Sequence, residues 1–310
     1  HTPEPAVSES AGLAAARALA ARPLDLPPGL DLEWLGVSGY RMTYEGTSIF
    51  VDPYVSRVPL RSLLLRRAAL PDPDKLGTYI SAPGEVAGIL IGHTHFDHAV
   101  DAPAIARRYG AKAYGSASLL HLMRLHGLAE LAVEVVPGKP YELGPFVVRF
   151  IRSRHSKILL GRRVLFDGEL SCEHLDGLSP STYKCGQVWG IHIRVAGIDL
   201  YHQGSADLDD EELGRLPVDI FLAGVAGREF TPDYWRRVLT RLDPRLVVPT
   251  HYDNFFTPLG DRLDLVMRAR LEAVPQEVEA VSRDARVVAL RRIDMPEGEG
   301  SPETGRNRGD

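Results

Sequence analysis

The sequence feature that most limits the possible folds and functions of this chain is a six-residue motif, His-Thr-His-Phe-Asp-His, at positions 93–98. The motif follows an apolar run, Ala87 to Ile91, whose pattern predicts a buried strand. Three imidazoles and a carboxylate this close together are costly unless something binds them, because protonated histidines repel each other. Neutral imidazole and carboxylate are preferred ligands of zinc and related divalent ions. The motif therefore predicts a metal site at a strand end, and a solvated polar loop is the weaker alternative.

A metal site of this kind needs further ligands from distant parts of the chain. On a tight loop His93 and His95 would project to one side, while Asp97 and His98 would face a second position. His155 follows a predicted strand at 146–151 and His251 follows one at 246–249. Strand ends are where layered α/β folds gather their sites. From the residues alone both histidines stay open candidates, and His202, which also ends a strand, competes with them.

Strand and helix patterns alternate along both halves of the chain. A hairpin unit opens the fold, with predicted strands at 32–37, 40–44 and 47–51. Further strands are predicted at 87–91, 112–114, 131–136, 146–151, 188–195, 198–202, 218–223, 246–249 and 286–290, and helices at 101–108, 116–125, 231–242 and 263–271. This order predicts an α/β protein in which two mixed sheets face each other under outer helices.

The domain organisation follows from composition along the chain. We expect an N-terminal helical or extended segment at 1–30 and a single main domain at 31–293. Residues 58–76 look like an insertion that forms a surface helix. Residues 294–310 are dominated by Pro, Gly, Glu, Ser and Arg, which predicts a disordered tail.

Composition excludes several classes of function. Hydrophobic residues make up 44% and charged residues 25%, as in a soluble globular protein with a sizeable core. Asp and Glu number 41 against 36 Lys and Arg, a formal net charge of −5 that argues against a nucleic-acid partner. No apolar run reaches the roughly 18–20 residues that a membrane span needs. The chain has two cysteines, Cys172 and Cys185. We favour the interpretation that they are free thiols in a cytoplasmic protein over a single disulfide in an exported one, and export stays open.

The strand-end motif, a later single His, a Gly-then-acid segment and a final strand-end His resemble the metallo-β-lactamase fold superfamily. The resemblance spans about residues 32 to 290, and the six-residue motif is specific for it. The opening hairpin with Asp52-Pro53-Tyr54 is similar to the branch of L-ascorbate-6-phosphate lactonase-like metal-dependent hydrolases, which also includes phospholipase D enzymes acting on N-acyl ethanolamine lipids. The resemblance implies a four-layer αβ/βα sandwich with one or two metal ions at the sheet edges.

The resemblance also implies a ligand set. One zinc would be held by His93, His95 and His155, and the second by Asp97, His98 and His251. The family places a bridging Asp directly after a Gly, whereas this chain has Ser205 after Gly204 and a carboxylate only at Asp207. We favour Asp207 as the bridge. The alternative is that Ser205 takes the position and weakens the second metal, with His202 compensating.

These ligands predict a zinc-dependent hydrolase. Zinc lowers the pKa of bound water from about 15.7 to roughly 7, so hydroxide becomes available to attack a small ester, lactone, amide or phosphodiester. Asp97 would be the catalytic residue that orients this water, and Asp52, Thr94 and Asp253 are candidates to orient the ligands. We expect two zinc ions per chain, with Mn²⁺ or Fe²⁺ as alternatives. The expected partner is a small molecule, and homo-oligomer formation stays open.

Two other functions compete with this prediction. The superfamily supports β-lactamase chemistry, but its usual sequence context differs from the hairpin here. A metal-binding protein without turnover is the second alternative, favoured only by the irregular Gly204–Asp207 segment.

Overall fold

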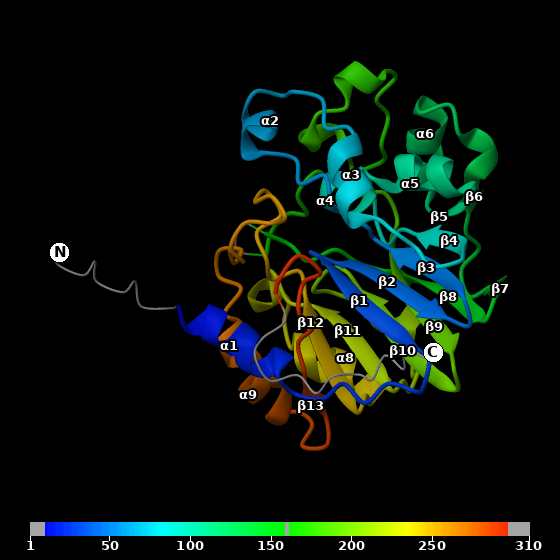
Figure 1. Cartoon of the computed structure of the whole chain (residues 1–310). Coiled ribbons are helices and arrows are strands. Elements are labelled where there is room, and N and C mark those ends of the chain that lie inside the picture. Colours follow the sequence, from blue (N-terminus) through cyan, green and yellow to red (C-terminus); the bar gives the residue numbers. More distant parts are fainter. Residues whose placement is uncertain (1–9, 159–160, 297–310) are drawn as a thin grey trace, which may run out of the picture.

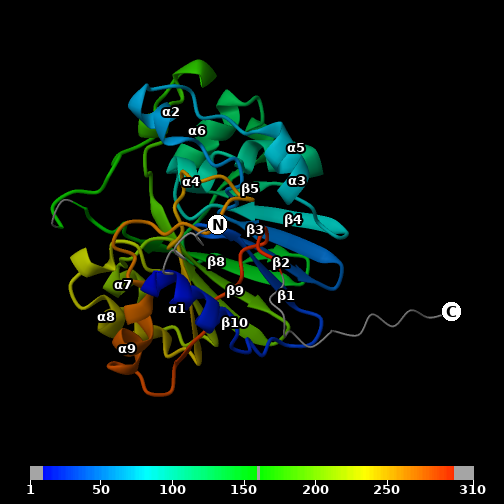
Figure 2. The same cartoon turned by 60° about the vertical axis from the view of Figure 1, so that its left-hand side comes forward.

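The computed structural model describes residues 10–158 and 161–296. Two β-sheets pack face to face and helices cover their outer faces, which gives four layers (Figures 1 and 2). The first sheet contains, in spatial order, β1 (Asp31–Gly36), β2 (Gly39–Tyr44), β3 (Thr47–Val51), β4 (Glu85–Leu90), β5 (Ala113–Gly115) and β6 (Ala132–Glu134). The second contains β13 (Arg286–Val287), β12 (Leu246–Thr250), β11 (Ile220–Gly224), β10 (Ile198–Gln203), β9 (Val188–Val195), β8 (Phe146–Ser153) and β7 (Tyr141–Leu143). The α/β sandwich expected from the sequence is confirmed.

The helices divide between the two outer layers (Figure 2). Those on the side of the first sheet are α2 (Leu60–Leu64), α3 (Pro73–Tyr79), α4 (Phe96–Ala99), α5 (Ala102–Tyr109) and α6 (Ala117–Leu125). Those on the side of the second sheet are α1 (Ala11–Ala20), α7 (Asp210–Leu213), α8 (Tyr234–Leu242) and α9 (Val274–Glu279). No helix among the described residues is long and apolar enough to cross a membrane.

Strand direction brings distant segments of the second sheet to one edge. Strands β10 to β13 run parallel, and β8 is antiparallel to β9, which is antiparallel to β10. The carboxyl ends of β8, β10 and β12 therefore lie at the same edge. His155, Gly204 and His251 each follow one of these ends. In the first sheet β4 runs parallel to β3 and β5, and the motif at 93–98 follows its carboxyl end.

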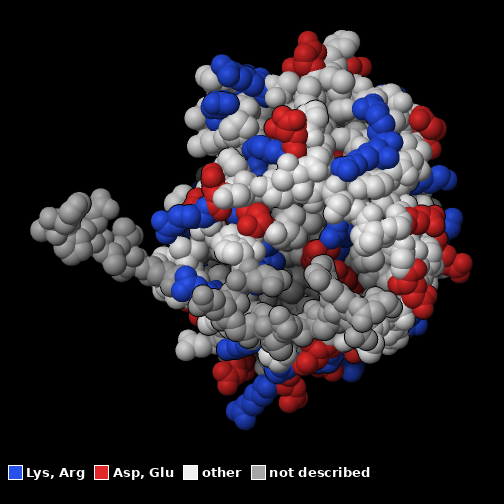
Figure 3. All heavy atoms as spheres, in the orientation of Figure 1, with Lys and Arg blue, Asp and Glu red and all other residues white. Residues whose placement is uncertain are grey.

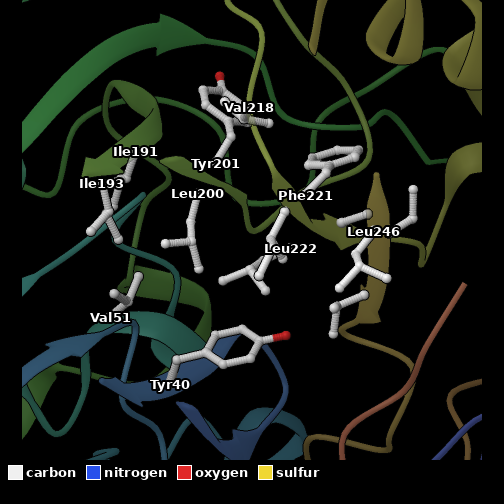
Figure 4. Packing of buried hydrophobic residues seen from close by; sticks show 14 of the residues in the cluster. Tyr40, Val51, Ile191, Ile193, Leu200, Tyr201, Val218, Phe221, Leu222 and Leu246 are labelled. Carbon is white, nitrogen blue, oxygen red and sulfur yellow. The ribbon is translucent and has the colours of Figure 1, made fainter. Parts of the chain in front are cut away.

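The core lies between the two sheets. Tyr40 and Val51 of the first sheet face Leu200, Leu222 and Leu246 of the second (Figure 4), and each of these side chains is at most 1% exposed. Apolar burial on this scale is the main force holding the layers together. This packing fixes the position of the sheet edge where the polar side chains of both halves meet.

Most predicted elements match the structure to within a few residues, but one helix was predicted wrongly. Residues 263–270 form no helix, because Arg268 and Arg270 adopt left-handed backbone angles (φ 65° and 44°) that interrupt helical hydrogen bonding. The chain becomes helical only at the 3₁₀ turn Leu271–Ala273, which leads into α9.

Two further differences concern short elements. The segment 58–76 contains two short helices, α2 and α3, where one surface helix was expected, and Pro73 begins the second. Strand β7 was not predicted. The expected disordered tail lies outside the described residues from position 297 onward. Cys172 and Cys185 are free thiols, the second of them buried.

Candidate metal centre

The motif at 93–98 crosses from an extended loop into a helix. His95 caps the N-terminus of α4 with extended angles (φ −60°, ψ 152°), so Asp97 and His98 lie in the first helical turn. Because the backbone changes direction at His95, side chains only a few residues apart face two different places. The loop is also tight at Gly92, where a Cβ atom would lie 3.1 Å from the Asp52 carboxylate.

One set of ligand atoms is the three-histidine cluster, made of His93, His95 and His155. One nitrogen of each ring lies within 4.8 Å of the others. His95 Nε2 donates to the Leu165 carbonyl at 2.7 Å, and His155 Nδ1 donates to the carbonyl of Ser156 at 2.7 Å. These bonds leave the opposite ring nitrogens with lone pairs available to a metal.

The other set is the aspartate–histidine cluster, made of Asp97, His98 and His251, whose ligand atoms also lie within 4.8 Å of one another. His251 Nε2 is 3.1 Å from Asp97 Oδ2. His98 Nδ1 donates to Asp52 Oδ2 at 2.7 Å, and Asp52 Oδ1 accepts from the Gly92 amide at 2.6 Å. Asp52 therefore orients His98, in the place that the sequence suggested for it.

Electrostatics differ between the clusters. Burial lowers the pKa of His95 to about 4, and burial together with neighbouring imidazoles holds the pKa values of His93 and His155 well below 6.5. These three rings are neutral at pH 7. Burial also acts against a charged His98, but the Asp97 and Asp52 carboxylates outweigh it and raise the pKa of His98. Burial raises the pKa of Asp97 too, but His98 and His251 outweigh it, so the Asp97 pKa lies below its usual range.

The donor set fits divalent metal ions. Within the two clusters, the buried ring nitrogens His93 Nε2, His98 Nε2 and His251 Nδ1 have no hydrogen-bond partner among the described residues. A buried polar atom without a partner costs roughly 1–3 kcal/mol. Imidazole nitrogens and a carboxylate, clustered and in part unpartnered, are the donors that zinc and related ions bind. The rings of His93 and His98 are 3.8 Å apart between centroids, so the two clusters adjoin.

The loop that carries His251 is fixed by a buried ion-pair network. His251 has a left-handed backbone (φ 59°), and its amide donates to the Val37 carbonyl at 2.8 Å. Asp253 accepts from the Val37 amide at 2.8 Å and from Arg57 at 2.9 Å. Arg292 also reaches Asp253, at 3.3 Å. Asp253 therefore stabilises the His251 loop. The Thr94 hydroxyl instead donates to the Lys184 carbonyl at 2.6 Å and to the Cys185 carbonyl at 3.2 Å, neither of which belongs to a ligand cluster.

The residues considered for the bridging position, Ser205 and Asp207, belong to neither ligand cluster. Asp207 lies outside both, where Arg237 donates to its carboxylate at 3.4 Å and burial raises its pKa. Its bridging role stays a prediction. Ser205 Oγ accepts from the Ser156 amide at 2.9 Å. His202 donates from Nε2 to the Ser38 carbonyl at 2.8 Å and belongs to neither cluster.

A cavity of about 370 Å³ opens beside His155. Its lining includes the basic side chains Arg154 and Lys157 and the acidic side chains Asp167, Glu169 and Asp207. This volume is in the range of small-molecule sites, roughly 300–1,000 Å³.

Sequence reasoning missed the groups that hold the three-histidine cluster. They are the carbonyls of Leu165 and Ser156, and a backbone carbonyl carries no signal in residue type. It also missed Arg57 and Arg292, both of which are at most 1% exposed and whose only sequence signal is their charge.

Comparisons with known proteins bear on the fold and the family. The family model described as "Beta-lactamase superfamily domain" matches residues 31–251. A UPF0173 metal-dependent hydrolase of Polynucleobacter asymbioticus is 25% identical over 72% of this chain and 74% of its own length. Another from Staphylococcus aureus is 26% identical over 73% of this chain and 87% of its own. The structure of Igni18, a metallo hydrolase from Ignicoccus hospitalis, superimposes with a TM-score of 0.52 at 19% identity, covering 85% of this chain and 95% of that one.

Proposed function

Because this chain is a metal-dependent hydrolase of the metallo-β-lactamase superfamily, we propose that its two adjoining clusters bind zinc and hydrolyse a small ester, lactone, amide or phosphodiester. The observation that carries the proposal is the pair of adjoining clusters, in each of which three ligand atoms lie within 4.8 Å of one another and at least one buried nitrogen is unpartnered. Zinc supplies a nucleophilic hydroxide near neutral pH and a Lewis acid for the developing oxyanion. The lactonase-like resemblance of the opening hairpin favours lactones among these substrates.

The protein's own residues have separate roles in this proposal. His93, His95 and His155 would hold one ion, and Asp97, His98 and His251 the other. Asp97 stays ionised, because His98 and His251 lower its pKa, so it can orient a water molecule by accepting its hydrogen bond. Asp52 keeps the Nε2 lone pair of His98 directed toward the site by accepting from Nδ1.

The cavity beside His155 supports a small substrate. It carries both basic and acidic side chains, so it suits a compact polar molecule better than a polyanion. Acidic and basic side chains are also interspersed over the face of the molecule seen in Figure 3. This distribution differs from the continuous basic surface that a nucleic acid requires.

Metal content and hydrolysis measured together test the proposal. The protein, purified without added metal or chelator, is analysed by elemental mass spectrometry and offered a panel of lactones, aryl esters, amides, phosphodiesters and a β-lactam. We expect bound zinc and turnover of at least one class, and both should fall in His95→Ala. Protein that binds no metal even when zinc is added would contradict the proposal and favour a non-catalytic role.

A further inference from the structure

The segment Gly204–Ser205 contacts residues beside both ligand clusters. A Cβ atom on Gly204 would lie 2.9 Å from Asp52 Oδ2 and 3.2 Å from the His98 ring, so this backbone packs against the aspartate–histidine cluster. The next side chain lies on the other side. Ser205 Oγ accepts from the Ser156 amide at 2.9 Å and donates to Ser156 Oγ at 3.2 Å. Ser156 directly follows His155 of the three-histidine cluster.

Charge is distributed unevenly around this segment. Together the two clusters contain five imidazoles and one carboxylate, Asp97. The next carboxylate, Asp52, bonds to His98 and so also belongs to the aspartate–histidine side. Among the described residues, the three-histidine cluster includes no anionic ligand. Asp207 lines the neighbouring cavity, but Arg237 and the Leu208 amide hold its carboxylate.

Two divalent ions in adjoining buried clusters repel each other strongly, since the low local dielectric weakens screening. An anionic side chain placed between them offsets this repulsion and contacts both ions. Position 205 follows the Gly204 backbone that packs against His98, and its side chain bonds to the residue after His155; it is 5% exposed and carries a neutral hydroxyl that is already hydrogen-bonded. A second ion would therefore bind against repulsion that the neutral side chain at position 205 does not relieve.

We infer that the two clusters bind metal in two separate steps of unequal affinity, and that the neutral Ser205 beside them causes the difference. This inference rests on the proposed metal-binding function and concerns how the ions are retained. The first ion is retained through purification and the second exchanges with solution. Ser205→Asp places a carboxylate beside the clusters and converts the pair into one site that retains both ions.

Zinc titration by calorimetry and zinc counting after desalting test this inference, with melting curves as a check of folding. For the unaltered protein we expect a two-step isotherm and about one retained ion per chain. Ser205→Asp should tighten the second step by on the order of tenfold or more and retain about two ions. Ser205→Asn, which matches the aspartate in size but has no charge, should behave like the unaltered protein.

Each outcome has a defined meaning. Two ions of equal affinity in the unaltered protein overturn the inference but leave the proposed function standing. A folded Ser205→Asp protein whose second step is unchanged also overturns it. If that variant does not fold, Ser205→Glu, which supplies the same charge on a longer side chain, takes its place in the titration. Absence of zinc binding in every protein would instead contradict the proposed function.

Discussion

Each ligand cluster takes two of its three ligands from one short motif, yet different parts of the molecule hold the two clusters in place. The three-histidine cluster is oriented by backbone carbonyls of Leu165 and Ser156. The aspartate–histidine cluster is oriented by buried side chains, Asp52 and Asp253, and the latter is paired with Arg57 and Arg292. The orientation of the ligands therefore depends on the backbone path in the first cluster and on buried charged side chains in the second. This difference predicts distinct responses to mutation and to pH.

Removing a ligand from the three-histidine cluster should have the largest effect. We expect His95→Ala to reduce kcat/KM by more than about a hundredfold, exceeding the roughly 10–100-fold loss typical when an outer-shell partner is removed. Retained metal should fall as well. The matched control is His174→Ala, because His174 is exposed and lies outside both clusters. Equal activity in the two variants would remove His95 from the site.

The metal-free protein should show opposite pH responses in the two clusters. The pKa of His95 is about 4 when folded, so between pH 6.5 and 4 the unfolded state binds the extra proton. Its contribution to the free energy of unfolding therefore falls by about 3 kcal/mol as the pH drops through this range. The folded pKa of His98 is raised, so its contribution is present below pH 6.5 and is lost as pH rises through that folded pKa.

Denaturant unfolding of chelator-treated protein between pH 4.5 and 8 measures this contrast. His95→Gln should flatten the loss of stability on acidification, whereas His98→Gln should remove a stabilising contribution that operates at low pH. If both substitutions change the pH dependence of the free energy of unfolding in the same direction, the clusters are not electrostatically distinct.

A smaller loss of metal affinity is expected when the hydrogen bond from His98 to Asp52 is weakened. Asp52→Asn keeps the size of the side chain but removes its charge, so zinc affinity at the aspartate–histidine cluster should fall by about 10–100-fold. The control is Asp199→Asn, since Asp199 also bonds a histidine, His192 Nε2, at 2.7 Å but on strands away from the metal ligands. A competition titration with a chromophoric chelator gives both values, and an identical loss in both proteins would argue against a specific role for Asp52.

The same contrast explains how much could be predicted from sequence. Strand patterns located both sheets, because alternating apolar runs report burial directly. Strand ends made His155 and His251 candidates beside His202, and only the family resemblance placed them in the ligand set. Asp52 and Asp253 could be suggested because they are polar residues at motif edges. The carbonyl of Leu165 could not, since its contact with His95 depends on the path of a loop 70 residues later in the chain. The helix expected at 263–271 failed because two left-handed residues are not visible as an apolar period.

The smallest effect is expected at Asp207, and it separates the two accounts of the bridging position. Arg237 and the Leu208 amide hold the Asp207 carboxylate outside both clusters, so Asp207→Ala should change zinc affinity by less than about threefold, as for a partly exposed ion pair. The calorimetric isotherm of this variant should keep both steps of the unaltered protein. Selective loss of the second step would instead show that Asp207 bridges the ions when metal is bound. The neutral side chain of Ser205 would then have no effect on how tightly the second ion binds. The difference between the clusters would in that case come from their supports alone.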